Sequence, residues 1–189
     1  MQAKQKKPEW LSALDKQISV MDKEDMLYSK AEYVSKKAAD IYKTHNDNLQ
    51  QSEELAQSDL YMDCFKRTKM YLQHFLISFS MMVERGEVPA SYFRYYGIGR
   101  DEIQLSDDIT DVELESMCRQ VFVGEDERIR NTDSQRVFNP SSVQVQAQYD
   151  IFHSYFEMLQ ILREHCRKSQ FALDAICQEA KSLSLKLSK

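Results

Sequence analysis

Residues 152–187 read FHSYFEMLQILREHCRKSQFALDAICQEAKSLSLKL. Eleven positions in this stretch follow one another in alternating steps of three and four residues, and all but Ser169 carry apolar or aromatic side chains: Phe152, Tyr155, Leu159, Leu162, Cys166, Ser169, Leu173, Ile176, Ala180, Leu183 and Leu187. An average spacing of about 3.5 residues is typical of an α-helix that supercoils against other helices. Residues 143–187 are therefore predicted to form one long, heptad-patterned helix.

The length of this helix limits how it can be packed. At 1.5 Å per residue it would measure about 65 to 70 Å, whereas a compact globule of this chain length is roughly 32 Å across. Either the N-terminal helices lie beside it in an elongated three- or four-helix bundle, or the helix projects and pairs with another chain. We favour the bundle, and dimerisation of the distal end alone is compatible with it.

Residues 8–84 are predicted to supply the N-terminal helices. The first begins near Pro8, at the position where proline is tolerated, and pauses at residues 22–25. A second amphipathic segment follows, and residues 45–58 are polar, as in a solvated helix end or a loop. The third helix, from about Tyr61, is apolar on several sides, which predicts a place at the centre of the bundle.

Residues 85–142 are predicted to form an irregular elbow of short helices and a polar loop. All four glycines lie in this part of the chain, and so does Pro89. Thr110 and Glu113 have the spacing of a capping box, in which each side chain accepts a hydrogen bond from the other residue's amide. Residues 125–142 are polar and are expected to form an exposed loop.

Composition supports an all-α fold in a single helical domain, residues 1–189. The chain has 4 Gly and 3 Pro, too few for the turns of a many-stranded β fold. Its formal net charge of -5 argues against nucleic-acid binding. The most apolar stretch, residues 70–83, is shorter than the roughly 20 residues that cross a membrane. Four cysteines without metal-binding spacing predict buried thiols in a cytoplasmic protein.

Catalytic and metal-binding motifs are weak in this sequence. Asp150 and His153 have an acid-x-x-His spacing with Glu157 one turn beyond, but a carboxylate-bridged metal bundle needs two Glu-x-x-His pairs. Glu164, His165 and Cys166 are neighbours on a helix and point about 100° apart, so they cannot form a catalytic relay. No catalytic residue, metal or cofactor is therefore predicted.

An aromatic cluster is the candidate partner interface: Tyr92, Phe93, Arg94, Tyr95 and Tyr96. Aromatic residues and arginine are enriched in interface hot spots, although these rings could instead cap the end of the bundle. The leading hypothesis is a non-enzymatic helical interaction protein, an adaptor, accessory subunit or assembly chaperone, that binds a protein partner or itself through helices. The alternative is a helical-bundle enzyme or a small-ligand or metal binder with a polar site near His153, Glu157 and His74.

Overall fold

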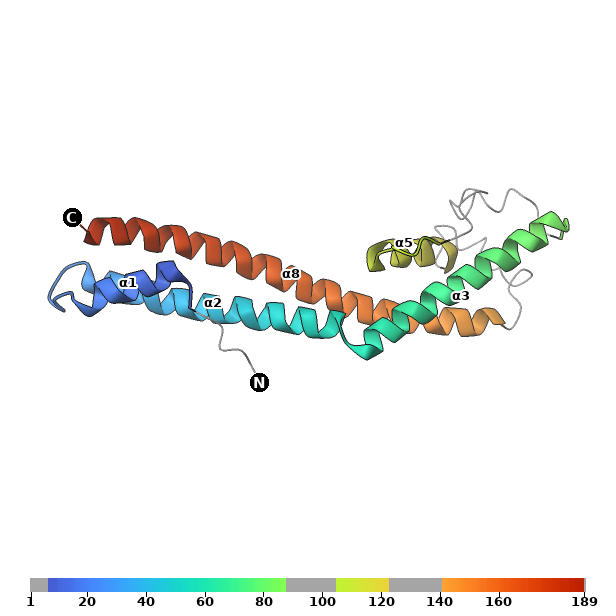
Figure 1. Ribbon diagram of the computed structural model, residues 1–189, viewed down its shortest axis with the longest axis horizontal. Helices are drawn as coiled ribbons and strands as arrows, with labels where there is room; N and C mark the ends of the chain where they lie inside the picture. The colour runs from blue at the N-terminus through green and yellow to red at the C-terminus, as the bar shows by residue number, and fades with distance from the viewer. Residues whose placement is uncertain (1–6, 88–104, 123–140, 189) are drawn as a thin grey trace. The chain divides into compact units, whose positions relative to one another are not determined.

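The computed structural model describes residues 7–87, 105–122 and 141–188. These residues form five α-helices and no strand (Figure 1). The helices are α1 (Glu9–Ser19), α2 (Tyr28–Ala56), α3 (Asp59–Glu84), α5 (Asp111–Phe122) and α8 (Ser141–Leu187). The predicted all-α bundle is confirmed, and so is the long C-terminal helix, which has 47 residues.

The chain divides into two compact units. The first contains residues Met1–Glu54 and Gln160–Lys189, and the second contains Leu55–Leu159. Both α2 and α8 contribute residues to each unit. The single-domain organisation of residues 1–189 stays a prediction.

The first unit is built from α1, α2 and the C-terminal part of α8, which lie side by side (Figure 1). Its core is a cluster of buried apolar residues from all three helices: Leu11, Leu14, Ala31, Val34, Ala38, Ile176, Ala180 and Leu183. The small alanines allow the helix backbones to approach closely. At one edge, the Ser184 hydroxyl donates to Gln17 Oε1 at 2.6 Å and joins α8 to α1.

The second unit packs α3, α5 and the first part of α8 around another apolar cluster. Its buried members are Tyr61, Leu72, Leu76, Leu105, Leu114, Cys118, Tyr149, Phe152, Phe156 and Leu159.

Along α8, the eleven predicted stripe positions from Phe152 to Leu187 are all buried or half-buried. The heptad pattern therefore identified the inward face of α8 correctly.

Local signals define the ends of α3. The Ser58 hydroxyl accepts from the Tyr61 amide at 3.2 Å and caps the N-terminus. At the C-terminus, Gly86 adopts φ of 71°, and the amides of Gly86 and Glu87 donate to Val83 and Met82, each at 3.0 Å. This is a Schellman motif, whose left-handed residue is favoured to be glycine.

The predicted capping box is present at the start of α5. The Thr110 amide donates to Glu113 Oε2 at 2.8 Å, and the Glu113 amide donates to Thr110 Oγ1 at 3.2 Å.

The polar segment of residues 45–58 does not form a loop, because α2 continues to Ala56. Pro89, Gly97, Gly99 and most of the predicted 125–142 loop lie outside the described residues.

The cysteines are all free. Cys118 is buried, whereas Cys64, Cys166 and Cys177 are half-buried, so the prediction of buried thiols holds fully only for Cys118.

Among the helices that the structure describes, none combines the length and apolarity that a membrane span requires.

Candidate functional site

Helix α3 has two apolar faces. One face is buried and carries Tyr61, Thr68, Leu72, Leu76 and Phe79. Of these, Tyr61, Leu72 and Leu76 belong to the core of the second unit. The other face carries Met62, Met70, Ile77 and Met81, whose side chains are 40, 48, 45 and 45% exposed. At about 100° per residue, these four positions fall within an arc of about 100°, roughly opposite the buried face. We call these four side chains the α3 outer face.

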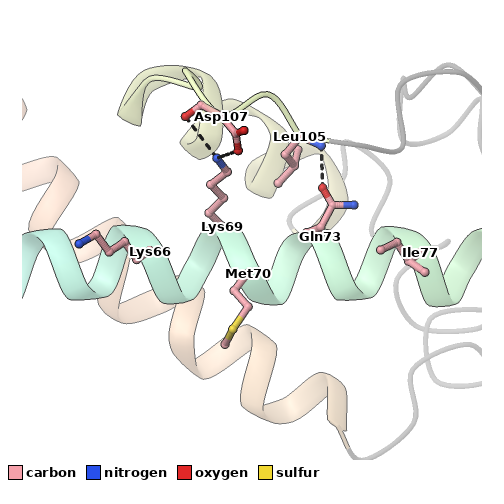
Figure 2. A pocket seen from close by; sticks show the side chains of 7 residues that line it. All are labelled: Lys66, Lys69, Met70, Gln73, Ile77, Leu105 and Asp107. Atoms are coloured by element: carbon pink, nitrogen blue, oxygen red, sulfur yellow. Dashed lines mark hydrogen bonds and ion pairs between the residues drawn. The ribbon is translucent and has the colours of Figure 1, made fainter.

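A hollow of about 740 Å³ opens beside this face (Figure 2). Among the described residues it is lined by Lys66, Lys69, Met70, Gln73, Ile77, Leu105 and Asp107. All of them belong to the second unit. The volume is in the range of about 300 to 1,000 Å³ in which proteins bind ligands, so the hollow has room for several side chains of a partner.

One wall of the hollow is held in place by polar contacts. The Gln73 Oε1 accepts from the Leu105 amide at 2.6 Å. Lys69 Nζ lies 3.6 Å from Asp107 Oδ1 and donates to the Asp107 carbonyl oxygen at 3.4 Å. Figure 2 shows Lys69 and Gln73 pointing toward Leu105 and Asp107, whereas Met70 points away from them.

Lys66 differs from Lys69 in its electrostatic surroundings. Its side chain is exposed. Within the described parts of the chain, no carboxylate forms an ion pair with it. The neighbouring Arg67 is paired with Asp63 at 2.8 Å. The hollow therefore has one cation whose charge is not balanced locally.

A second polar feature is the cluster around Glu115, between α5 and α8. The Glu115 side chain is buried, and its Oε1 accepts from Arg119 Nη2 at 2.9 Å and from Tyr149 Oη at 3.4 Å. His153 Nδ1 lies 3.2 Å from the same oxygen, without the alignment of a hydrogen bond. His153 Nε2 lies 3.7 Å from Glu157 Oε1. The imidazole is thus placed between two carboxylates.

This cluster shifts the ionisation of its neighbours. Burial, and secondarily the negative charge of Glu115, raise the pKa of the Tyr149 phenol to about 12. The hydrogen bond to Glu115 raises the pKa of the Arg119 guanidinium. Burial also raises the pKa of the Cys118 thiol well above its ordinary range, which leaves it a poor nucleophile.

The predicted site near His153 includes residues of this polar cluster. The structure brings His153 and Glu157 together, whereas His74 is an exposed residue of α3 and forms no ion pair with Glu157. The two carboxylates approach opposite nitrogens of the ring, so they cannot converge on one ion with it. No group of three or more potential metal ligands is found among the residues that the structure describes.

Sequence reasoning missed Glu115 and the α3 outer face. Glu115 precedes Arg119 by four residues, a helical pairing that the sequence contains, but its contact with His153 joins residues far apart in the chain. The apolar positions all round α3 predict a buried central helix, but in the structure Met70, Ile77 and Met81 are close to half-exposed. The predicted interface, Tyr92 to Tyr96, lies outside the described residues.

Comparison with protein-family models, with curated proteins and with solved structures finds no match to this chain.

Proposed function

We propose that this chain is a non-enzymatic helical protein–protein interaction module, an adaptor, accessory subunit or assembly chaperone, and that the α3 outer face contacts its partner. The observation that carries the proposal is the second apolar face of α3. Its other face already packs in the core, and yet Met70 and Ile77 remain close to half-exposed beside a hollow.

The chemistry of this face suits binding. Burying apolar surface is favourable by about 25 cal/mol per Å², which a partner would gain by covering these side chains. Methionine is unbranched and polarisable, so its side chain can adapt to the shape of a partner. Contiguous exposed apolar side chains with charged neighbours are typical of interaction sites.

Two other surfaces remain candidates. The aromatic cluster from Tyr92 to Tyr96 stays a predicted interface, because it carries the residue types of hot spots. Self-association through the distal heptads of α8 also stays a prediction. Neither is needed for binding at α3.

The polar cluster is the observation behind a second candidate function, a helical-bundle enzyme or small-ligand binder near His153. A buried carboxylate beside an imidazole and a tyrosine with a raised pKa is the kind of arrangement that functional sites use. Purified protein that carries a bound small molecule, or a cofactor with visible absorbance, would favour this function over the interaction module.

The interaction module can be tested with a photoreactive amino acid placed in α3, in cells that make the protein. At Ile77 it should form a covalent adduct of defined mass with a partner. Leu60 is the control position, since it is 65% exposed but lies about 100° around the helix from Ile77. After the partner is identified, Met70→Glu should weaken its binding to the purified full chain by about tenfold or more, because it places a carboxylate in an apolar contact.

The absence of an adduct at Ile77, or equal adducts at Ile77 and Leu60, would contradict the proposal. So would unchanged affinity of the purified partner for Met70→Glu.

A further inference from the structure

The interior of the first unit changes character along α2 and α8. Where α1 packs on both helices, a cluster of apolar residues is buried. Neither core cluster includes any residue of 42–54 in α2 or of 160–172 in α8. Within these two stretches, which we call the polar seam, His45 is the one buried residue. The paired helices therefore have no apolar core at the polar seam.

Hydrogen bonds join the two helices at the polar seam. His45 Nδ1 lies 2.9 Å from Ser169 Oγ, and Asn48 Nδ2 donates to the same oxygen at 3.3 Å. Asn48 Nδ2 also lies 3.4 Å from the His165 carbonyl oxygen, to which it donates. Residue numbers rise along α2 while they fall along α8, so the two helices run antiparallel (Figure 1).

The heptad spacing places polar residues of α2 at the next inward positions as well. Counted in steps of three and four from the contact between His45 and Ser169, Asn48 and Ser52 of α2 fall opposite Cys166 and Leu162 of α8. Cys166 and Leu162 are half-buried. The inward face of α2 is thus polar at three successive positions, and it offers α8 no apolar side chain there.

This composition lowers the free energy needed to separate the helices locally. Burial of apolar surface is the main force that holds helices together, whereas hydrogen bonds between helices are exchanged for hydrogen bonds to water when the helices part. Gln160 Nε2 is buried and has no hydrogen-bond partner among the described residues, so separation would let water satisfy it. Parts of a protein with few buried apolar contacts open more readily than its core.

We infer that α2 and α8 separate locally at the polar seam while the parts of both helices that pack against α1 stay together. The opening exposes the inner face of α8 at Leu162 and Cys166. It is a conformational device of the first unit, and it does not depend on binding at α3.

Hydrogen exchange on the natural full chain, read by mass spectrometry, tests the opening directly. A helical stretch of about 13 residues is marginal in water once its neighbour has left, so its amides exchange. After correction for intrinsic rates, amides of residues 42–54 and 160–172 should exchange at least about tenfold faster than those of residues 32–41 and 173–184. Equal protection of the polar seam and of the stretches that pack against α1 would overturn the inference.

An apolar replacement tests the cause of the opening. His45→Leu combined with Ser169→Leu puts two facing apolar side chains into the polar seam, and it should slow exchange of residues 42–54 and 160–172 by about tenfold or more. Lys43→Leu combined with Lys168→Leu is the matched control, because both lysines are exposed and lie in the same two stretches. The control pair should change exchange there by less than about threefold.

Two results of this comparison would contradict the inference. Exchange at the polar seam that is unchanged by His45→Leu with Ser169→Leu would mean that the polar layer does not set the opening. Equal slowing by the control pair would mean that added leucine, rather than its place between the helices, is responsible.

Discussion

Ser169 is the one polar residue of the C-terminal heptad stripe, and it meets a buried histidine. Its hydroxyl lies 2.9 Å from His45 Nδ1, and Asn48 Nδ2 donates to the same oxygen at 3.3 Å. His45 is only 7% exposed. The sequence predicted that position 169 faces inward, because periodicity is local. It could not predict His45 as the partner, since that depends on how two distant segments align.

This contact has a measurable contribution to stability. Ser169→Ala should lower the free energy of unfolding by about 1 to 2 kcal/mol, because it leaves a buried ring nitrogen without a partner. Ser182→Ala is the control, since Ser182 is an exposed residue of the same helix, and it should change stability by less than about 0.5 kcal/mol. Urea denaturation measures both. Equal effects of the two substitutions would mean that the His45–Ser169 contact contributes nothing.

Tyr149 predicts a dependence of stability on alkaline pH. Its pKa is raised from the ordinary value near 10 to about 12, so the folded state holds the phenolic proton more tightly than the unfolded state. This contribution is fully present below pH 10 and is lost as the pH rises from 10 to 12. A shift of about two pKa units corresponds to roughly 2 to 3 kcal/mol, and the expected loss of stability is of this order.

The test compares the full chain with Tyr149→Phe by urea denaturation from pH 9 to 12. The natural protein should lose more stability over this range than the variant, because the variant lacks the titrating group. Parallel pH dependences of the two proteins would show that Tyr149 titrates as an ordinary tyrosine.

At the scale of the helices, features encoded by neighbouring residues were predicted well. The α8 stripe and the Thr110–Glu113 capping box both depend on side chains within one or two helical turns. The exposure of Met70 and Ile77 could not be predicted in this way, because it depends on how many helices surround α3. The contact between Glu115 and His153 was missed for the same reason, since it joins two helices.

The capping box predicts a loss of stability on mutation. Thr110→Ala should destabilise the protein by about 1 kcal/mol, because the Glu113 amide at the start of α5 loses its hydrogen-bond acceptor. Thr110→Ser should retain most of the stability, because its hydroxyl can accept the same hydrogen bond. Hydrogen bonds from the Thr110 amide and hydroxyl lower the pKa of Glu113. The contribution of that carboxylate is therefore present at neutral pH and is lost as the pH falls through its folded-state value.

Thermal or urea unfolding at neutral pH and at pH 3 measures this effect. The difference between the natural protein and Thr110→Ala should be larger at neutral pH. A difference that grows in acid would contradict the role assigned to Glu113.

At the scale of the whole molecule, the last part of α8 serves the core of the first unit. Truncation after Gln170 removes Ile176, Ala180 and Leu183, which are all buried there against α1 and α2. Losing buried residues of this kind costs about 2 to 5 kcal/mol each for the larger ones, which approaches the total stability of a typical domain, about 5 to 15 kcal/mol.

Hydrogen exchange on the truncated chain should therefore show loss of protection in α1 and in α2 up to Glu54, while the core helix α3 of the second unit keeps its slow amides. Light scattering on both chains measures whether the distal heptads also join two copies. Retained protection in α1 and α2 would contradict the assigned packing.

The most direct test of binding at α3 is the oxidation rate of its methionines, measured by mass spectrometry after brief labelling with hydroxyl radicals. Met70 and Met81 are about half-exposed in the isolated chain, and Met26, at 94% exposed in the first unit, is a control with the same chemistry. We expect Met70 and Met81 to react several-fold more slowly in the cells that make the protein than in the purified chain, while the ratio for Met26 stays near one. Equal rates for Met70 in cells and in isolation, relative to Met26, would contradict the claim that a partner covers this face.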